Sequence, residues 1–204
     1  MSTDTLPPLI RDSVIHVLFD VDDDDQQYRL QLEELREANK ADSQVVKGIF
    51  KKMKAADSVN LVKVAAIIDK YGWLGPDEIG DQCNTAIFLV IQHADLSTQQ
   101  RYLPIMRAAA LKARIKARHL AMLEDRVNVL TGKMQKYGSQ IFWDTWKRVY
   151  LLAPLEDPDN VDARRSAVGL PPLKIYLSGY GIIWDPEAYK KRLPQDIEYF
   201  KTLK

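Results

Sequence analysis

Apolar residues recur every three to four positions along most of the first 131 residues, which is the period of an amphipathic helix. The sequence predicts five helices there, at about 24–38, 43–71, 81–94, 97–114 and 117–131. Gly72 and Gly132 end two of them, as glycine commonly does after a helix. The Ser-Thr-Gln-Gln run at 97–100 is a capping box that opens the fourth. Short connections favour antiparallel packing of neighbouring helices.

The pattern changes after Gly132, where β-branched and aromatic residues predict a hairpin at about 139–152. A short helix follows, from Asp157-Pro158 to Val168, and we interpret the aromatic-rich end of the chain as an irregular cover. The predicted fold class is mainly α: a single-domain helical bundle with a small β-hairpin and an irregular C-terminal cover. Residues 1–20 would be an N-terminal extension, and residues 21–204 the single helical domain.

The composition is that of a soluble globular protein, with 46% hydrophobic and 28% charged residues among 204. Lysine and arginine (29) balance aspartate and glutamate (28), so no net charge attracts nucleic acid or an anionic membrane. The longest apolar run, Ala86 to Ile91, is too short to span a bilayer, and the N-terminus lacks a signal-peptide pattern. We therefore expect a cytoplasmic protein with neither nucleic acid nor membrane as partner.

Metal and cofactor motifs are also missing from the sequence. The single Cys83 excludes an internal disulfide and a multi-cysteine zinc site. The run Asp22 to Asp25 lacks the alternating ligands and the glycine of a calcium loop, and we interpret it as the acidic start of a helix. The sequence contains neither a glycine-rich phosphate loop nor a nucleophile elbow. We expect no metal and no cofactor.

Polar residues interrupt the apolar stripe of the second predicted helix. At 100° per residue, Asp57 and Asn60 fall in the middle of that stripe. An unsatisfied buried polar group costs about 1–3 kcal/mol, so such residues need a partner or a function. The alternative is that the helix breaks at Ala56 and that Asp57 or Ser58 caps a new one.

The third and fifth predicted helices carry the same signal. Arg126 lies at the centre of an apolar arc with Asp125 at its edge, and because arginine keeps its charge it needs a carboxylate, carbonyls or an anionic ligand. The alternative is a structural ion pair with Asp125. His93 lies on the apolar side of its helix, two residues before Asp95, and is either a satisfied core histidine or an acid–base group.

Six short stretches together resemble a bacterial family of mostly helical proteins of unknown function. They read DQQYR (25–29), IDKYGW (68–73), QHAD (92–95), LEDR (123–126), QKYGSQ (135–140) and DPDNVD (157–162), the last followed by Arg164-Arg165. The resemblance covers about residues 20–177, although Leu74 replaces a usual proline and Ser139 a common threonine. It implies that one set of polar residues forms a shared site: Asp25, Arg29, Asn60, His93, Asp95, Asp125, Arg126, Gln135, Tyr137, Gln140, Asp162 and Arg165.

Two functions fit these residues, and the sequence does not decide whether the protein is an enzyme. In the first, a buried polar pocket binds a small polar molecule or peptide. If the protein is an enzyme, the same pocket also processes that molecule. His93 would be the general acid or base, Asp95 or Asp125 would orient it, Arg126 would clamp an anion, and the remaining polar residues would bind the ligand.

The alternative function is a non-enzymatic protein-interaction module, such as an immunity or regulatory partner. Its polar residues would only hold the bundle together. Its contact surface would be the aromatic residues of the C-terminal third, Trp143, Trp146, Tyr150 and Trp184. A pocket with converging polar groups favours the first function, and a sealed polar network favours the second.

Overall fold

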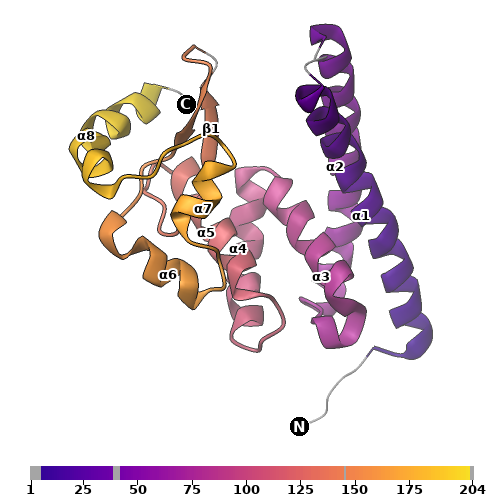
Figure 1. Cartoon of the computed structure of the whole chain (residues 1–204). Coiled ribbons are helices and arrows are strands. Elements are labelled where there is room, and N and C mark those ends of the chain that lie inside the picture. The colour runs from indigo at the N-terminus through magenta and orange to yellow at the C-terminus, as the bar shows by residue number, and fades with distance from the viewer. Residues whose placement is uncertain (1–5, 39–41, 145, 203–204) are drawn as a thin grey trace. The chain divides into compact units, whose positions relative to one another are not determined.

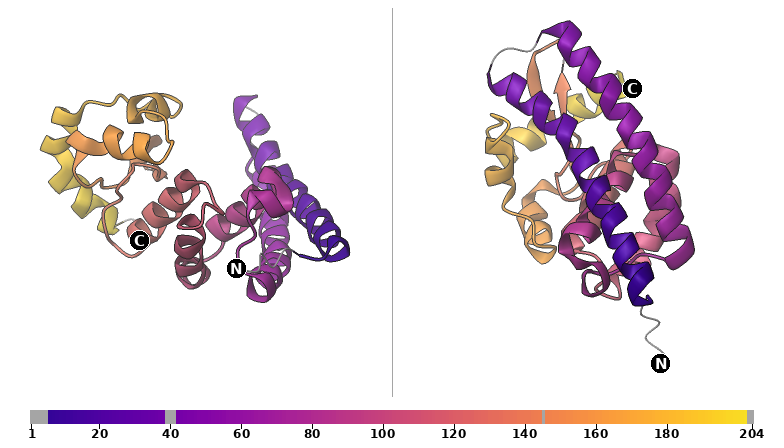
Figure 2. Two further views of the ribbon diagram at one scale, coloured as in Figure 1. Left: turned by 90° about the horizontal axis from the view of Figure 1, so that it is seen from below. Right: turned by 90° about the vertical axis from the view of Figure 1, so that its right-hand side faces the viewer.

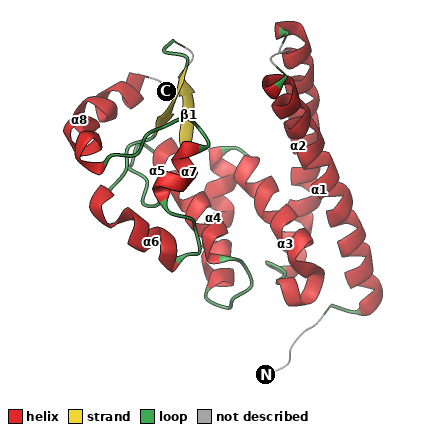
Figure 3. Cartoon of the chain, in the orientation of Figure 1, coloured by secondary structure: helices red, strands yellow, loops and turns green. Residues whose placement is uncertain are grey.

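The computed structural model describes residues 6–38, 42–144 and 146–202, and most of them are helical (Figure 1). These residues form eight α-helices and one two-stranded antiparallel hairpin (Figure 3), which confirms the mainly α fold with a small hairpin. The chain divides into two compact units, residues 1–115 (the N-terminal unit) and 116–204 (the C-terminal unit).

The N-terminal unit contains α1 (Pro8–Glu37), α2 (Ser43–Tyr71), α3 (Pro76–His93) and α4 (Leu96–Ala110). The long helices α1 and α2 lie side by side, and both contact α3 (Figures 1 and 2). Residues 8–20, expected in an extension, belong to α1, which buries Val14 and Leu18. Residues 1–5 of that extension lie outside the described part of the chain.

Local signals explain the ends of α2. The Asp42 side chain accepts hydrogen bonds from the backbone N–H groups of Gln44 and Val45, at 2.7 and 3.2 Å. Gly72 ends the helix with a φ of 73°, which glycine adopts without strain. Between these caps α2 is continuous, so a break at Ala56 is the wrong interpretation of the polar residues in its stripe.

The other two helices of this unit differ from expectation at their starts. α3 begins at Pro76, where proline suits the first helical turn, and Gly80 interrupts it with a φ of 80°. The cap of α4 is Asp95, two residues before the expected Ser97. The core between the helices is apolar, and Leu18, Val64, Ile87 and Met106 are fully or almost fully buried in it.

The C-terminal unit contains α5 (Ala117–Leu130), β1 (Ile141–Asp144), β2 (Val149–Leu152), a 3-10 turn (Pro158–Asn160), α6 (Val161–Ala167), α7 (Leu173–Ser178) and α8 (Pro186–Thr202). In the hairpin, Ile141 pairs with Leu152 and Asp144 with Val149. The main apolar cluster of the C-terminal unit contains Leu155, Val161, Leu173, Leu177 and Tyr189.

The end of the chain, expected to be an irregular cover, is helical. Pro194 lies inside α8 and is a break signal in the sequence. Tyr189, Leu193 and Ile197 nevertheless recur every four residues, and Tyr189 and Leu193 pack on the apolar cluster of the unit. Tertiary packing of this stripe therefore outweighs the local effect of the proline.

Candidate functional site

The residues expected to form one site belong to two polar groups, one in each unit. Asp25, Arg29, Asn60 and His93 are in the N-terminal unit, together with Asp57, and we name these five residues the His93 cluster. The C-terminal unit holds a second group, which we name the Asp125 network: Asp125, Arg126, Gln135, Tyr137, Gly138, Ser139, Gln140 and Arg165. Asp95 and Asp162 lie outside both and cap helices.

Asp25 is the centre of the His93 cluster. It lies on the buried face of α1 with 1% of its surface exposed. One carboxylate oxygen lies 3.1 Å from Nδ1 of His93 and 3.3 Å from the guanidinium of Arg29. The other accepts a hydrogen bond from Gln26 at 2.6 Å. A buried carboxylate with this set of donors orients the imidazole ring.

The ionisation of Asp25 follows from these contacts. Burial alone would raise its pKa, but the hydrogen bond from His93, the positive charge that His93 carries when protonated, and the charge of Arg29 outweigh burial. The pKa of Asp25 therefore lies below its ordinary value, and the group is a carboxylate at neutral pH. The ionised Asp25 accepts a hydrogen bond from His93 Nδ1–H, so a neutral ring carries its proton on Nδ1.

Arg29 joins this carboxylate to a second one. Its guanidinium lies 3.0 Å from the Asp57 side chain, so Asp57 pairs across the α1–α2 interface. Asp57 is not among the residues predicted from sequence to form the site, although its place in the apolar stripe marks it as unusual. The cluster therefore joins two carboxylates, one guanidinium and the imidazole of His93.

His93 is the last residue of α3, and its side chain is 22% exposed. Its only hydrogen-bond partner among the described residues is Asp25, at Nδ1. The Nε2 atom therefore keeps an unused lone pair when the ring is neutral. A histidine oriented at one nitrogen and unpaired at the other has the arrangement of a general base.

Asn60 adds an unsatisfied polar atom to the same helix interface. The residue is fully buried, and Nδ2 donates to the carbonyl of Val21, one helical turn before Asp25, at 3.3 Å. Its Oδ1 has no hydrogen-bond partner among the described residues. Native proteins leave few buried polar atoms unpaired, and such atoms often mark functional positions.

Asp95 has the contacts of a helix cap. Its carboxylate accepts from the Thr98 N–H at 2.8 Å and from the Ser97 hydroxyl at 2.9 Å. The hydrogen bond from the Thr98 N–H has the largest effect, and together these hydrogen bonds hold the pKa of Asp95 below its ordinary value. Asp162 has a similar role in the C-terminal unit, where it accepts from the Leu173 N–H at the start of α7, at 2.7 Å.

Asp125 is the centre of the second group and is fully buried. Its carboxylate accepts from the N–H groups of Lys136, Tyr137 and Ser139 and from the Ser139 hydroxyl, at 2.6 to 3.1 Å. Three backbone N–H groups of one loop and the Ser139 hydroxyl therefore satisfy it. Burial raises the pKa of Asp125 despite these hydrogen bonds.

Arg165 holds the other side of this loop, with 1% of its surface exposed. It donates to the carbonyls of Tyr137 and Pro171, both at 2.6 Å. Its guanidinium lies 5.0 Å from the Tyr176 ring, and the Tyr176 hydroxyl donates to the carbonyl of Ser139 at 2.9 Å. Asp125 thus binds the amides of the loop, while Arg165 and Tyr176 bind its carbonyls.

Two glutamines complete the network. Gln135 donates to the carbonyls of Gln140 and Ala153 and accepts from the Gln140 N–H, at 2.8 to 3.1 Å. The Gln140 amide donates to Ser139 at 3.0 Å and accepts from Arg126 at 3.4 Å. The polar side chains of the Asp125 network therefore form hydrogen bonds mainly with backbone groups of the same unit. This is the arrangement of a structural element.

The described residues add two further findings. They contain no group of three histidine, cysteine, aspartate or glutamate side chains placed to hold a metal ion. Within the same ranges, no helix combines the length and the apolar character needed to cross a membrane.

Comparison with known proteins identifies the family. Residues 13–184, most of the chain, match the family of unknown function DUF6624. Neither the search of curated proteins nor the search of solved structures gives a match. Because the match covers both units and all the polar residues described above, the chain belongs to the DUF6624 family of unknown function.

Proposed function

We propose that the N-terminal unit binds a small polar molecule at His93 and exchanges a proton with it through Nε2. One observation carries the proposal: a buried, ionised Asp25 holds Nδ1 at 3.1 Å, while Nε2 has no partner among the described residues. Asp25 acts as a positioning residue, and Nε2 is the atom that meets the ligand.

Two carboxylates, those of Asp25 and Asp57, face one guanidinium in the His93 cluster. Arg29 is engaged by both carboxylates, and it therefore fixes Asp25 and Asp57 rather than binding the ligand.

The alternative, a protein-interaction module, rests on a different region. Trp146, in the turn of the hairpin, is 89% exposed, and Trp143 is 50% exposed. Exposed tryptophans are common at protein interfaces. In this alternative the His93 cluster is structural, so a change at His93 would lower stability and affect no small ligand.

Nitrogen NMR of the labelled imidazole ring tests the proposal. The probe is a panel of amino acids, dipeptides, organic acids, sugars and nucleosides added to the full chain. We expect the Nδ1–H tautomer for neutral His93 and a shift of its Nε2 resonance by at least one class of compound. His93→Gln should abolish binding of that class in ligand-observed spectra.

His16→Gln is the matched control, because His16 also lies near a carboxylate, Asp20 at 3.6 Å, but is largely exposed on the same unit. It should leave binding unchanged. A panel that shifts no Nε2 resonance, or a ligand that binds His93→Gln as well as the wild type, would overturn the proposal.

A further inference from the structure

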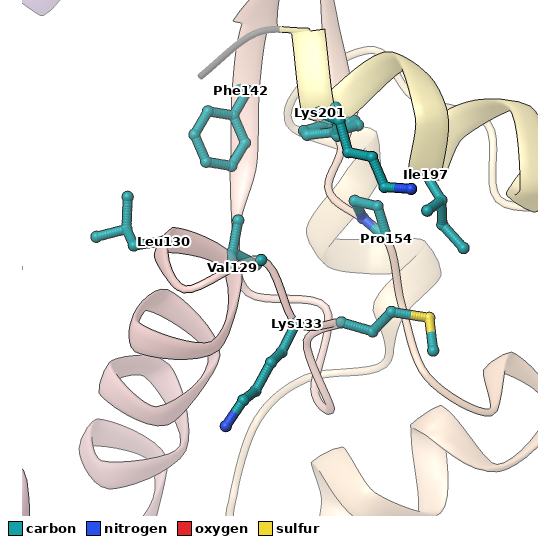
Figure 4. Close-up of a pocket in the computed structure, with 10 residues that line it drawn as sticks. Val129, Leu130, Lys133, Phe142, Pro154, Ile197 and Lys201 are labelled. Atoms are coloured by element: carbon teal, nitrogen blue, oxygen red, sulfur yellow. The ribbon is translucent and has the colours of Figure 1, made fainter.

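A second candidate binding site lies in the C-terminal unit, in an apolar pocket with a volume of about 210 Å³. The end of α5, the loop after it, β1, Pro154 and the end of α8 form its walls (Figure 4). Three of its apolar side chains remain partly open to solvent: Leu130 at 41%, Met134 at 39% and Phe142 at 36%. Apolar surface of this kind, gathered in a concave site, is typical of ligand pockets.

The walls are held in place by contacts that involve no ligand. The rings of Phe142 and Phe200 meet edge to face, with centroids 5.6 Å apart. One residue earlier in α8, the Tyr199 hydroxyl donates to Asp144 at 2.6 Å and anchors this helix to the hairpin. The Pro154 carbonyl accepts from the backbone of Gln135 at 2.8 Å. The pocket is therefore preformed, which lowers the entropic cost of binding.

The charged residues of the pocket have one sign. Lys133 and Lys201 are among the residues that line it (Figure 4), and no aspartate or glutamate is among the described residues that do so. The Lys201 ammonium pairs with Glu198 at 2.6 Å, one turn back along α8. The Lys133 ammonium has no carboxylate partner among the described residues. A ligand with an apolar body and one anionic end would complement this arrangement.

The volume limits the size of the apolar part. An apolar cavity of about 150 Å³ accepts benzene, and drug-sized ligands occupy roughly 300–1,000 Å³. A volume of about 210 Å³ therefore suits one aromatic ring or a chain of about six to eight carbons. We infer that this pocket binds a free medium-chain carboxylate, whose tail lies between Met134 and the two phenylalanine rings and whose charged end pairs with Lys133.

Titration of the full chain with octanoate tests this inference, followed through the carbon-labelled methyl group of Met134. We expect a saturable shift of that methyl signal. 1-Octanol has the same tail without the charge, so it should bind more weakly. Lys133→Gln should weaken octanoate about two- to fivefold, the effect of an exposed ion pair, and leave octanol unchanged.

Lys174→Gln is the control, because Lys174 is an exposed lysine of the same unit outside the pocket. It should affect neither compound. Leu130→Gln, at a half-exposed position that tolerates a polar residue, should weaken both, with a thermal melt to verify folding. Three results would overturn the inference: no shift of the Met134 methyl signal, equal affinity for octanol and octanoate, or equal effects of Lys133→Gln and Lys174→Gln.

Discussion

Replacing Asp125 by asparagine keeps the shape of the side chain but exchanges one acceptor oxygen for a donor. The two carboxylate oxygens divide their donors, since one accepts from Lys136 at 2.6 Å and the other from the Ser139 N–H and hydroxyl at 3.1 and 2.9 Å. In either orientation the new NH₂ group therefore faces a buried backbone N–H. The remaining bonds also lose the strength that a charged acceptor gives them.

The cost follows from these contacts. One unsatisfied buried N–H costs about 1–3 kcal/mol, and each bond that becomes neutral loses roughly 1 kcal/mol. The loss has an offset, because burial raises the pKa of Asp125 and asparagine carries no charge to desolvate. We expect a net loss of about 2–4 kcal/mol, a large part of the stability of a unit of this size.

Urea unfolding at pH 7 measures the effect, with tryptophan fluorescence as the signal. Three of the four tryptophans, Trp143, Trp146 and Trp184, belong to the C-terminal unit. The control is Asp162→Asn: Asp162 is exposed and accepts one backbone N–H, and asparagine caps a helix about as well as aspartate. A loss below about 1 kcal/mol for Asp125→Asn, or equal losses for the two variants, would refute the structural role of the network.

Three further changes test other parts of the structure. Asp25→Asn should lower the free energy of unfolding at pH 6, and because the folded pKa of Asp25 lies below its unfolded value of 3.8, its contribution is lost as pH falls below about 4. The difference in urea midpoint between Asp25→Asn and the wild type should therefore be smaller at pH 3 than at pH 6. Asn60→Leu should leave the melting temperature unchanged or raise it, since Oδ1 has no partner among the described residues; a clear drop would show that the amide is needed for folding. Tyr189→Phe should cost about 1–2 kcal/mol in urea unfolding, because the buried hydroxyl accepts from the Leu155 N–H at 2.6 Å, and an unchanged midpoint would contradict that bond.

Local signals in the sequence were enough to place α2 but not α1. The bounds of α2 follow from Gly72 and from the apolar stripe, both of which are local. In α1 the aspartate run resembles a helix start, yet it lies in the middle of the helix. Partners distant in sequence accommodate it: Asp22 accepts from Gln82, and Asp24 lies 3.8 Å from Lys63. Tertiary contacts of this kind leave no mark in a local pattern.

The candidate site shows the same limit. Helical phase correctly indicates that Asn60 is buried, because periodicity reports which face of a helix is covered. In the fifth helix it places Arg126 at the centre of the apolar arc and Asp125 at its edge, whereas Asp125 is buried and Arg126 is partly exposed. It does not identify their partners. Those of Asp125 are mostly backbone N–H groups, which every residue type except proline supplies. Gly138 is explained only by the structure, since its φ is 68° and a Cβ there would lie 2.9 Å from the Leu173 side chain.

Unpaired atoms distinguish the two polar groups more clearly than their residue types do. Both contain a buried aspartate near an arginine, so from sequence both fit a catalytic centre. In the Asp125 network the carboxylate and the Arg165 guanidinium bind the loop from its two sides, and a change there acts on folding. In the His93 cluster two polar atoms, Nε2 of His93 and Oδ1 of Asn60, have no partner among the described residues. Polar atoms without a hydrogen-bond partner do not stabilise the fold, because apolar groups of the same shape would give equal or higher stability. His93 is therefore the position at which a change should affect ligand binding more than stability.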